Sequence, residues 1–151
     1  MIKPFIPNTF IPPTTFQTDH FYFKVLDDDI AELDYAAVMS SQKRLQGIFG
    51  PASNWPDPKM TLADNIASLK IHKHEFNTRK AFAFSVLDKS QNIYLGSIYI
   101  DPSPSVDYDC CVYLWIKDEY ICLDKTLHQV VSTWLCTHWP FENVLYPDRD
   151  C

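Results

Sequence analysis

The hydrophobic and polar positions change period several times along the chain, and each change marks a predicted element. Runs of β-branched and aromatic residues predict strands, whereas apolar residues that recur every three to four positions predict one face of a helix. The predicted order is strand, two helices, three strands, helix and strand. The predicted strands are residues 21–26, 81–88, 92–101, 108–116 and 142–146.

Two helices are predicted between the first and second strands. In the first, Asp28 or Asp29 from the DDD segment is the expected N-cap. The second begins at Thr61 and Asp64, which resemble a capping box, and ends near Arg79. The expected apolar face of the first helix is Ile30, Leu33, Ala37 and Val38, and that of the second is Leu62, Ile66, Leu69 and Phe76. The segment between them contains two glycines and three prolines and is expected to be a loop.

The three central strands are joined by short polar segments, so they are predicted to form an antiparallel meander. The helix after the meander has the most regular apolar face in the chain. That face consists of Leu123, Leu127, Val130, Val131, Trp134 and Leu135.

The first twenty residues, MIKPFIPNTFIPPTTFQTDH, contain four prolines between Phe and Ile residues. We expect residues 1–20 to form an extended proline-rich arm whose apolar side chains lie on the surface of a single domain, residues 21–151. The prolines interrupt any continuous apolar segment near the N-terminus. We therefore expect neither a signal peptide nor a membrane span, and a cytoplasmic location.

The composition of the chain argues against some classes of binding partner. A chain of 151 residues with 46% hydrophobic residues can bury a core. Its 13 basic and 19 acidic residues give a net charge of −6, which argues against a nucleic-acid or anionic-membrane partner. The five cysteines are odd in number and form no CxxC pair, so we expect free thiols in a reducing compartment and no metal site.

The element order and two segments resemble the GCN5-related N-acetyltransferase (GNAT) family. LGSIYID (95–101) is similar to the family's glycine-containing third strand, CCVYLWI (110–116) to its fourth strand, and a helix begins about seven residues later. The resemblance covers roughly residues 20–147. It implies an α/β (α+β) fold with a mostly antiparallel mixed sheet flanked by helices, truncated after the family's fifth strand. It also implies transfer of an acyl group from acyl-CoA to an amine.

The resemblance places acetyl-CoA or another acyl-CoA in the gap beside the fourth strand. The residues expected to bind it are Leu114, Trp115, Ile116, Lys117 and Lys125.

The family's pyrophosphate loop, Gln/Arg-x-x-Gly-x-Gly/Ala, is not matched here. Glu119, Cys122 and Asp124 fall at its three defining positions, and Asp118 adds another carboxylate. One like-charge contact near ~4 Å costs about 4 kcal/mol at an effective dielectric of about 20. We interpret Asp124 as the N-cap or first-turn carboxylate of the following helix rather than as a ligand contact.

The usual catalytic groups of the family are also not matched. The position of its glutamate base falls at Cys111, and the helix that supplies its tyrosine acid is not in the sequence, so the catalytic residues stay unknown. The residues expected to line a substrate cleft are Trp55, His72, Glu75 and Tyr113. A solvent-exposed helix face for His72 and Glu75, and a loop anchor for Trp55, are the structural alternatives.

Two hypotheses of function follow. The first is a GNAT-like acyltransferase that acetylates an unidentified small-molecule or protein amine. The alternative is a non-catalytic GNAT-fold protein that binds another ligand or a protein. A homodimer formed at the sheet edge near residues 142–146 is a further expectation.

Overall fold

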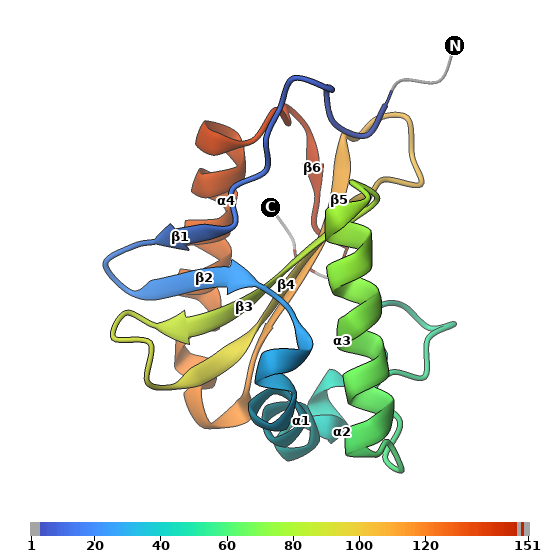
Figure 1. Cartoon of the computed structure of the whole chain (residues 1–151), viewed down its shortest axis with the longest axis vertical. Coiled ribbons are helices and arrows are strands. Elements are labelled where there is room, and N and C mark those ends of the chain that lie inside the picture. Colours follow the sequence, from blue (N-terminus) through green and yellow to red (C-terminus); the bar gives the residue numbers. More distant parts are fainter. Residues whose placement is uncertain (1–3, 148, 150–151) are drawn as a thin grey trace.

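The computed structural model describes residues 4–147 and Arg149. One six-stranded sheet, ordered β1-β2-β3-β4-β5-β6, runs through the molecule (Figure 1). Neighbouring strands are antiparallel except for the parallel pair β5 and β6. The strands are β1 (Thr15–Gln17), β2 (Phe21–Val25), β3 (Phe82–Asp88), β4 (Tyr94–Pro102), β5 (Cys110–Ile116) and β6 (Val144–Leu145).

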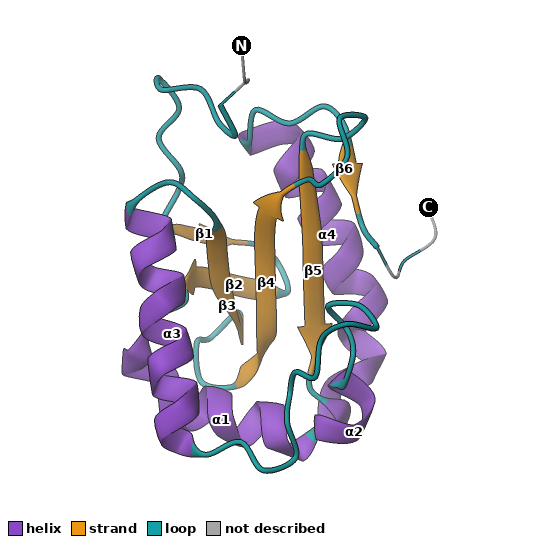
Figure 2. Cartoon of the chain, turned by 90° about the vertical axis from the view of Figure 1, so that its right-hand side faces the viewer, coloured by secondary structure: helices purple, strands orange, loops and turns teal. Residues whose placement is uncertain are grey.

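The helices lie on opposite faces of this sheet (Figure 2). They are α1 (Ala31–Ser40), α2 (Gln42–Leu45), α3 (Leu62–Asn77) and α4 (Asp124–His138), with short 3₁₀ helices η1 (Asp28–Ile30) and η2 (Asp118–Leu123). Helices α1 and α3 cover one face and α4 covers the other, so alternate residues of β2, β3, β4 and β5 enter two separate cores. Within the described residues, no helix is both long enough and apolar enough to cross a membrane.

The predicted meander and last helix are confirmed. β3, β4 and β5 pair in antiparallel order, as their short connections indicate. In α4, Leu127, Val131, Trp134 and Leu135 are buried. The indole ring of Trp134 lies 5.2 Å from the Phe23 ring centroid, which ties α4 to β2.

The start of α3 is also as predicted. Thr61 accepts a hydrogen bond from the Asp64 N–H at 3.1 Å, and the Asp64 carboxylate accepts one from the Thr61 N–H at 3.0 Å. These two bonds form a complete capping box.

The expected cap and apolar face of the first helix are wrong in part. Asp27, not Asp28 or Asp29, accepts the capping hydrogen bond, and it caps η1 rather than α1. Leu33 is 57% exposed, whereas Asp34 is only 3% exposed. A carboxylate therefore occupies the buried face of α1 where the sequence pattern predicts leucine.

The arm is more integrated than an extended surface segment. Residues 15–17 form β1 and pair with β2, and Ile6 is buried. The Phe5 ring lies between Phe82 and Phe141, at centroid distances of 5.8 and 5.7 Å. This stacking secures the segment around Phe5 to the core.

Candidate functional site

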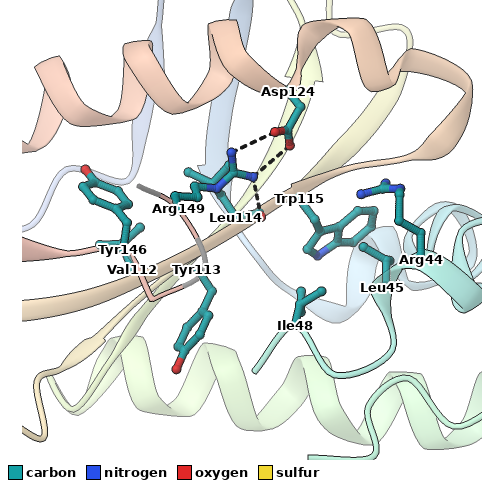
Figure 3. Close-up of a pocket in the computed structure, with 10 residues that line it drawn as sticks. All are labelled: Arg44, Leu45, Ile48, Val112, Tyr113, Leu114, Trp115, Asp124, Tyr146 and Arg149. Carbon is teal, nitrogen blue, oxygen red and sulfur yellow. Dashed lines mark hydrogen bonds and ion pairs between the residues drawn. The ribbon is translucent and has the colours of Figure 1, made fainter. Parts of the chain in front are cut away.

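A cavity opens where β5 and β6 separate. The two strands pair only at Cys110 with Val144 and at Cys111 with Leu145. Beyond these pairs, a cavity of about 240 Å³, here called the edge cavity, lies against β5 (Figure 3). It is lined by Arg44, Leu45, Ile48, Val112, Tyr113, Leu114, Trp115, Asp124, Tyr146 and Arg149.

Arg149 reaches into this cavity and joins α4 to β5. Its guanidinium donates to both carboxylate oxygens of Asp124, at 2.8 and 2.9 Å, and to the Leu114 carbonyl at 3.3 Å (Figure 3). The carboxylate of Asp124 lies in the first turn of α4, as expected, but it makes no capping bond, since the N-cap is Leu123. Of the two roles expected for Asp124, the first-turn carboxylate is confirmed and the N-cap is not, and the partner of its carboxylate is Arg149.

Arg44 makes the equivalent contact one pleat further along β5. Its guanidinium donates to the Ile116 carbonyl and to the carboxylate of Asp118. The carbonyl groups of Leu114 and Ile116 are thus each bound by an arginine that is itself paired with an aspartate. The carboxylates at the junction, which would repel a phosphate, are partly neutralised by these two cations.

The junction between β5 and α4 is helical rather than an open loop. The Asp118 N–H donates to Ser41 Oγ at 2.8 Å, and the Tyr120 N–H to the Lys117 carbonyl at 2.9 Å. The Asp124 N–H donates to the Ile121 carbonyl. These three N–H groups already have partners, so they are not free to bind a phosphate as the N–H groups of a glycine-rich loop do.

A second cavity of about 200 Å³, here called the inner cavity, lies on the face covered by α1 and α3. Aromatic rings form a continuous wall: Phe49 lies 5.1 Å from both Trp55 and Tyr99, and the His72 ring lies 5.4 Å from Tyr99. The lining residues are Asp34, Phe49, Trp55, Asn65, Ser68, Leu69, His72 and Tyr99.

Asp34 supplies the buried carboxylate of the inner cavity. It accepts hydrogen bonds from the Tyr94 hydroxyl and from Asn65 Nδ2, the latter at 3.0 Å. Burial raises the pKa of Asp34, and hydrogen bonds from Tyr94, Asn65 and Ser97 oppose that rise. The carboxylate is therefore held in a fixed position in an environment of low polarity.

The two cavities share a wall. Ile48 lines the edge cavity and Phe49, the next residue, lines the inner cavity. The Phe49 ring also lies 5.0 Å from Tyr113, which lines the edge cavity. The Phe49 ring therefore lies between residues that line the two cavities.

His72 is the titratable base of the inner cavity. Burial lowers its pKa, and the nearby Glu75 partly opposes the effect. Its Nδ1 lies 3.7 Å from the Glu75 carboxylate. Because the imidazole is predominantly neutral near pH 7, it has a free lone pair that can accept a proton. Burial raises the pKa of Asp101 to about 6, and the charge of Glu75 contributes to the rise.

Only some of the residues predicted to bind the cofactor line the edge cavity. Leu114 and Trp115 line the edge cavity, and the carbonyl of Ile116 binds Arg44. Lys117 and Lys125 do not line it. The ammonium of Lys117 lies 5.5 Å from the Tyr120 ring centroid, and Lys125 is exposed on the first turn of α4.

The predicted cleft residues are divided between the two cavities. Trp55 and His72 line the inner cavity, and Tyr113 lines the edge cavity. Glu75 borders the inner cavity through its contact with His72.

Sequence reasoning missed the two arginines and the buried aspartate. Arg44 and Arg149 gave no signal, because the groups that each contacts are distant in sequence. Asp34 did give one: it lies four residues after Ile30 and three before Ala37, on the predicted apolar face. A carboxylate at such a position indicates a buried polar site.

Comparison with solved structures identifies the fold. A ribosomal-protein-S5-alanine acetyltransferase from Vibrio fischeri aligns with a TM-score of 0.62 and 16% identity, over 82% of this chain and 68% of that one. The chain has the GNAT fold. A RimL ribosomal L7/L12 α-N-protein acetyltransferase in complex with coenzyme A aligns at 0.61 and 11% identity, over 81% of this chain and 66% of that one.

The GNAT fold is shared with proteins of different stated roles. Apo FdhC, a nucleotide-linked sugar GNAT, aligns with a TM-score of 0.61 and 10% identity, over 86% of this chain and 70% of that one. The present chain thus spans about two thirds of the length of the solved structures named here. No protein-family model and no curated protein sequence matches it.

Proposed function

We propose that this protein binds an acyl-CoA in the edge cavity and transfers the acyl group to an amine held in the inner cavity. The observation that carries the proposal is the opening between β5 and β6, which adjoins a second cavity containing a buried carboxylate and a neutral histidine. The RimL structure that shares the fold holds coenzyme A, which supports the choice of cofactor.

The edge cavity offers suitable groups for such a cofactor. The main-chain groups of Leu114 and Ile116 would pair with the amides of the pantetheine arm once the arginines turn away. The guanidinium groups of Arg44 and Arg149 would then bind the phosphates, because arginine forms strong charge-assisted hydrogen bonds with phosphate oxygens. These side chains would replace the glycine-rich loop, which η2 does not form.

The inner cavity offers a proton acceptor for the amine. An ammonium must lose a proton before its nitrogen can act as a nucleophile, and neutral His72 is suited to accept it. When bound, an acyl-CoA supplies the thioester carbonyl that the amine attacks. Proximity of the two reactants alone can lower the barrier by roughly 7–11 kcal/mol at best.

Calorimetric titration with acetyl-CoA tests the binding step. We expect micromolar affinity for the wild-type chain and about tenfold weaker binding for Arg44→Ala, since a charged hydrogen bond contributes about 1.5–3 kcal/mol. Lys43→Ala is the matched control, because Lys43 is the adjacent cation on α2, is exposed and does not line the cavity. Equal losses for the two variants would contradict the assigned role of Arg44.

Thiol release in the presence of a panel of amines tests the transfer step. We expect His72→Gln to lower the rate by about 10²-fold or more while acetyl-CoA binding is unchanged. A His72→Gln variant that retains the wild-type rate would remove His72 from the proposal.

The non-catalytic alternative is favoured by one observation. In this structure Arg149 and Arg44 occupy the Leu114 and Ile116 carbonyl groups that a pantetheine arm would use. If these contacts are permanent, the cleft binds something other than acyl-CoA. Absence of acetyl-CoA binding both to the wild type and to Arg149→Ala would support this alternative.

A further inference from the structure

The inner cavity combines a buried carboxyl group with aromatic walls. The carboxylate of Asp34 is only 3% exposed, and its partners Tyr94 and Asn65 are neutral. Throughout the described residues, no Lys or Arg side chain forms an ion pair with Asp34. A buried carboxylate without a cationic partner is costly, so a cation that enters this cavity is stabilised by it.

The walls favour the same kind of ligand. The Phe49 ring contacts both Trp55 and Tyr99 beside the cavity, and aromatic rings attract a cation positioned over their faces. Leu69, which lines the same cavity, provides an apolar contact for a hydrocarbon chain. The cavity therefore has a carboxyl group, aromatic rings and an apolar surface within one space.

The size of the cavity restricts the ligand. Its volume of about 200 Å³ suits a short alkyl chain bearing one ammonium group.

We infer that the inner cavity is a recognition site for a small primary alkylammonium, with Asp34 as the counter-ion and Phe49, Trp55 and Tyr99 as the aromatic wall. Its role as the acceptor site rests on the proposed function, but binding of the cation does not require a cofactor.

Titration with n-butylammonium chloride, followed by tryptophan fluorescence and calorimetry without acyl-CoA, tests the inference. The neutral probe 1-butanol has nearly the same shape. We expect the ammonium to bind at least about tenfold more tightly than the alcohol, because only the ammonium interacts with the carboxylate and the ring faces. Equal binding of the two probes, or no binding of the ammonium, would overturn the inference.

Asp34→Asn preserves the shape of the side chain and removes its charge. We expect it to weaken butylammonium binding by at least about tenfold. Asp107→Asn changes the net charge equally at an exposed loop position that does not line the cavity, so it should bind like the wild type. Wild-type affinity in Asp34→Asn would overturn the inference.

A second variant covers the case in which Asp34→Asn does not fold. Trp55→Leu removes one ring from a half-buried loop position and should weaken butylammonium binding several-fold without changing 1-butanol binding. Equal losses for both probes would mean that Trp55 only fills space, and would overturn the aromatic recognition. Tighter binding of a short peptide with a free N-terminus than of butylammonium would overturn the choice of a small amine.

These results are separable from those of the acetyl-CoA titration. Butylammonium binding without acetyl-CoA binding would reject the proposed function and keep the ammonium site. Acetyl-CoA binding without butylammonium binding would keep the proposed cofactor site and reject the ammonium site.

Discussion

Replacing Gly96 with alanine perturbs the contact that holds β5 against β4, and with it one wall of the edge cavity. A Cβ atom at this position would lie 1.9 Å from the Trp115 carbonyl oxygen and 2.9 Å from its carbonyl carbon. Ordinary contact begins near 3.4 Å, so β5 would have to move by about 1.5 Å (3.4 − 1.9). The obstruction is main chain, which cannot rotate away as a flexible side chain can.

The cost follows from that displacement. Overpacking costs about 1–3 kcal/mol, and each strand-pairing hydrogen bond lost costs about 0.5–1.5 kcal/mol. Alanine also restricts the unfolded chain more than glycine does, which offsets about 0.4–1 kcal/mol of this cost. We therefore expect Gly96→Ala to lower the free energy of unfolding by about 3 kcal/mol, which corresponds to a fall in Tm of roughly 6–12 °C.

Urea and thermal unfolding followed by circular dichroism measure this effect. Gly50→Ala is the matched control, because nothing lies within 4 Å of a Cβ there and only its positive φ of 113° resists the substitution. Its cost should be about 1–3 kcal/mol of backbone strain, with β5 undisturbed and acetyl-CoA binding unchanged. A Gly96→Ala variant within 1 kcal/mol of the wild type would refute the packing of β4 against β5 described above.

Three further predictions concern stability. Thr61→Ala should lower the free energy of unfolding by about 1 kcal/mol through loss of the α3 cap, seen as a fall in Tm of about 2–4 °C, and an unchanged Tm would contradict the capping role. Burial lowers the pKa of His72, so the unfolded chain binds more protons than the folded chain as the pH falls below 6.5, and the free energy of unfolding decreases. His72→Gln should reduce that decrease, measured by urea titrations between pH 7 and pH 5. The pKa of Asp101 is raised from 3.8 to about 6, so the folded chain loses stability as the pH rises from about 4 through 6 and this carboxyl group ionises. Asp101→Asn should therefore be more stable than the wild type at pH 7, by at most about 3 kcal/mol, and the difference should shrink towards pH 4.

Most of the fold could be predicted from the sequence, because local periodicity and turn chemistry agree with the final packing. The capping box at Thr61, the meander and the apolar face of α4 each depend on residues close together in sequence. The cap before α1 was misplaced by one or two residues within a run of three aspartates, where propensity alone does not distinguish the positions. The strand at residues 15–17 was missed because its partner, not its composition, defines it.

The site was less predictable, since it is built from contacts between distant residues. Arg149 pairs with Asp124 across 25 positions, and Arg44 contacts Ile116 across 72. Composition correctly indicated an acidic junction but could not show which cations approach it. Asp34 was visible as a polar residue on an apolar face, whereas its aromatic surroundings come from a loop and from β4.

Isothermal titration of the purified protein with acetyl-CoA at moderate salt tests the central claim most directly. The account predicts saturable binding in the micromolar range that weakens about tenfold in Arg44→Ala and is unchanged in Lys43→Ala. No binding at millimolar acetyl-CoA would contradict it, and would mean that the GNAT fold of this chain serves a different ligand.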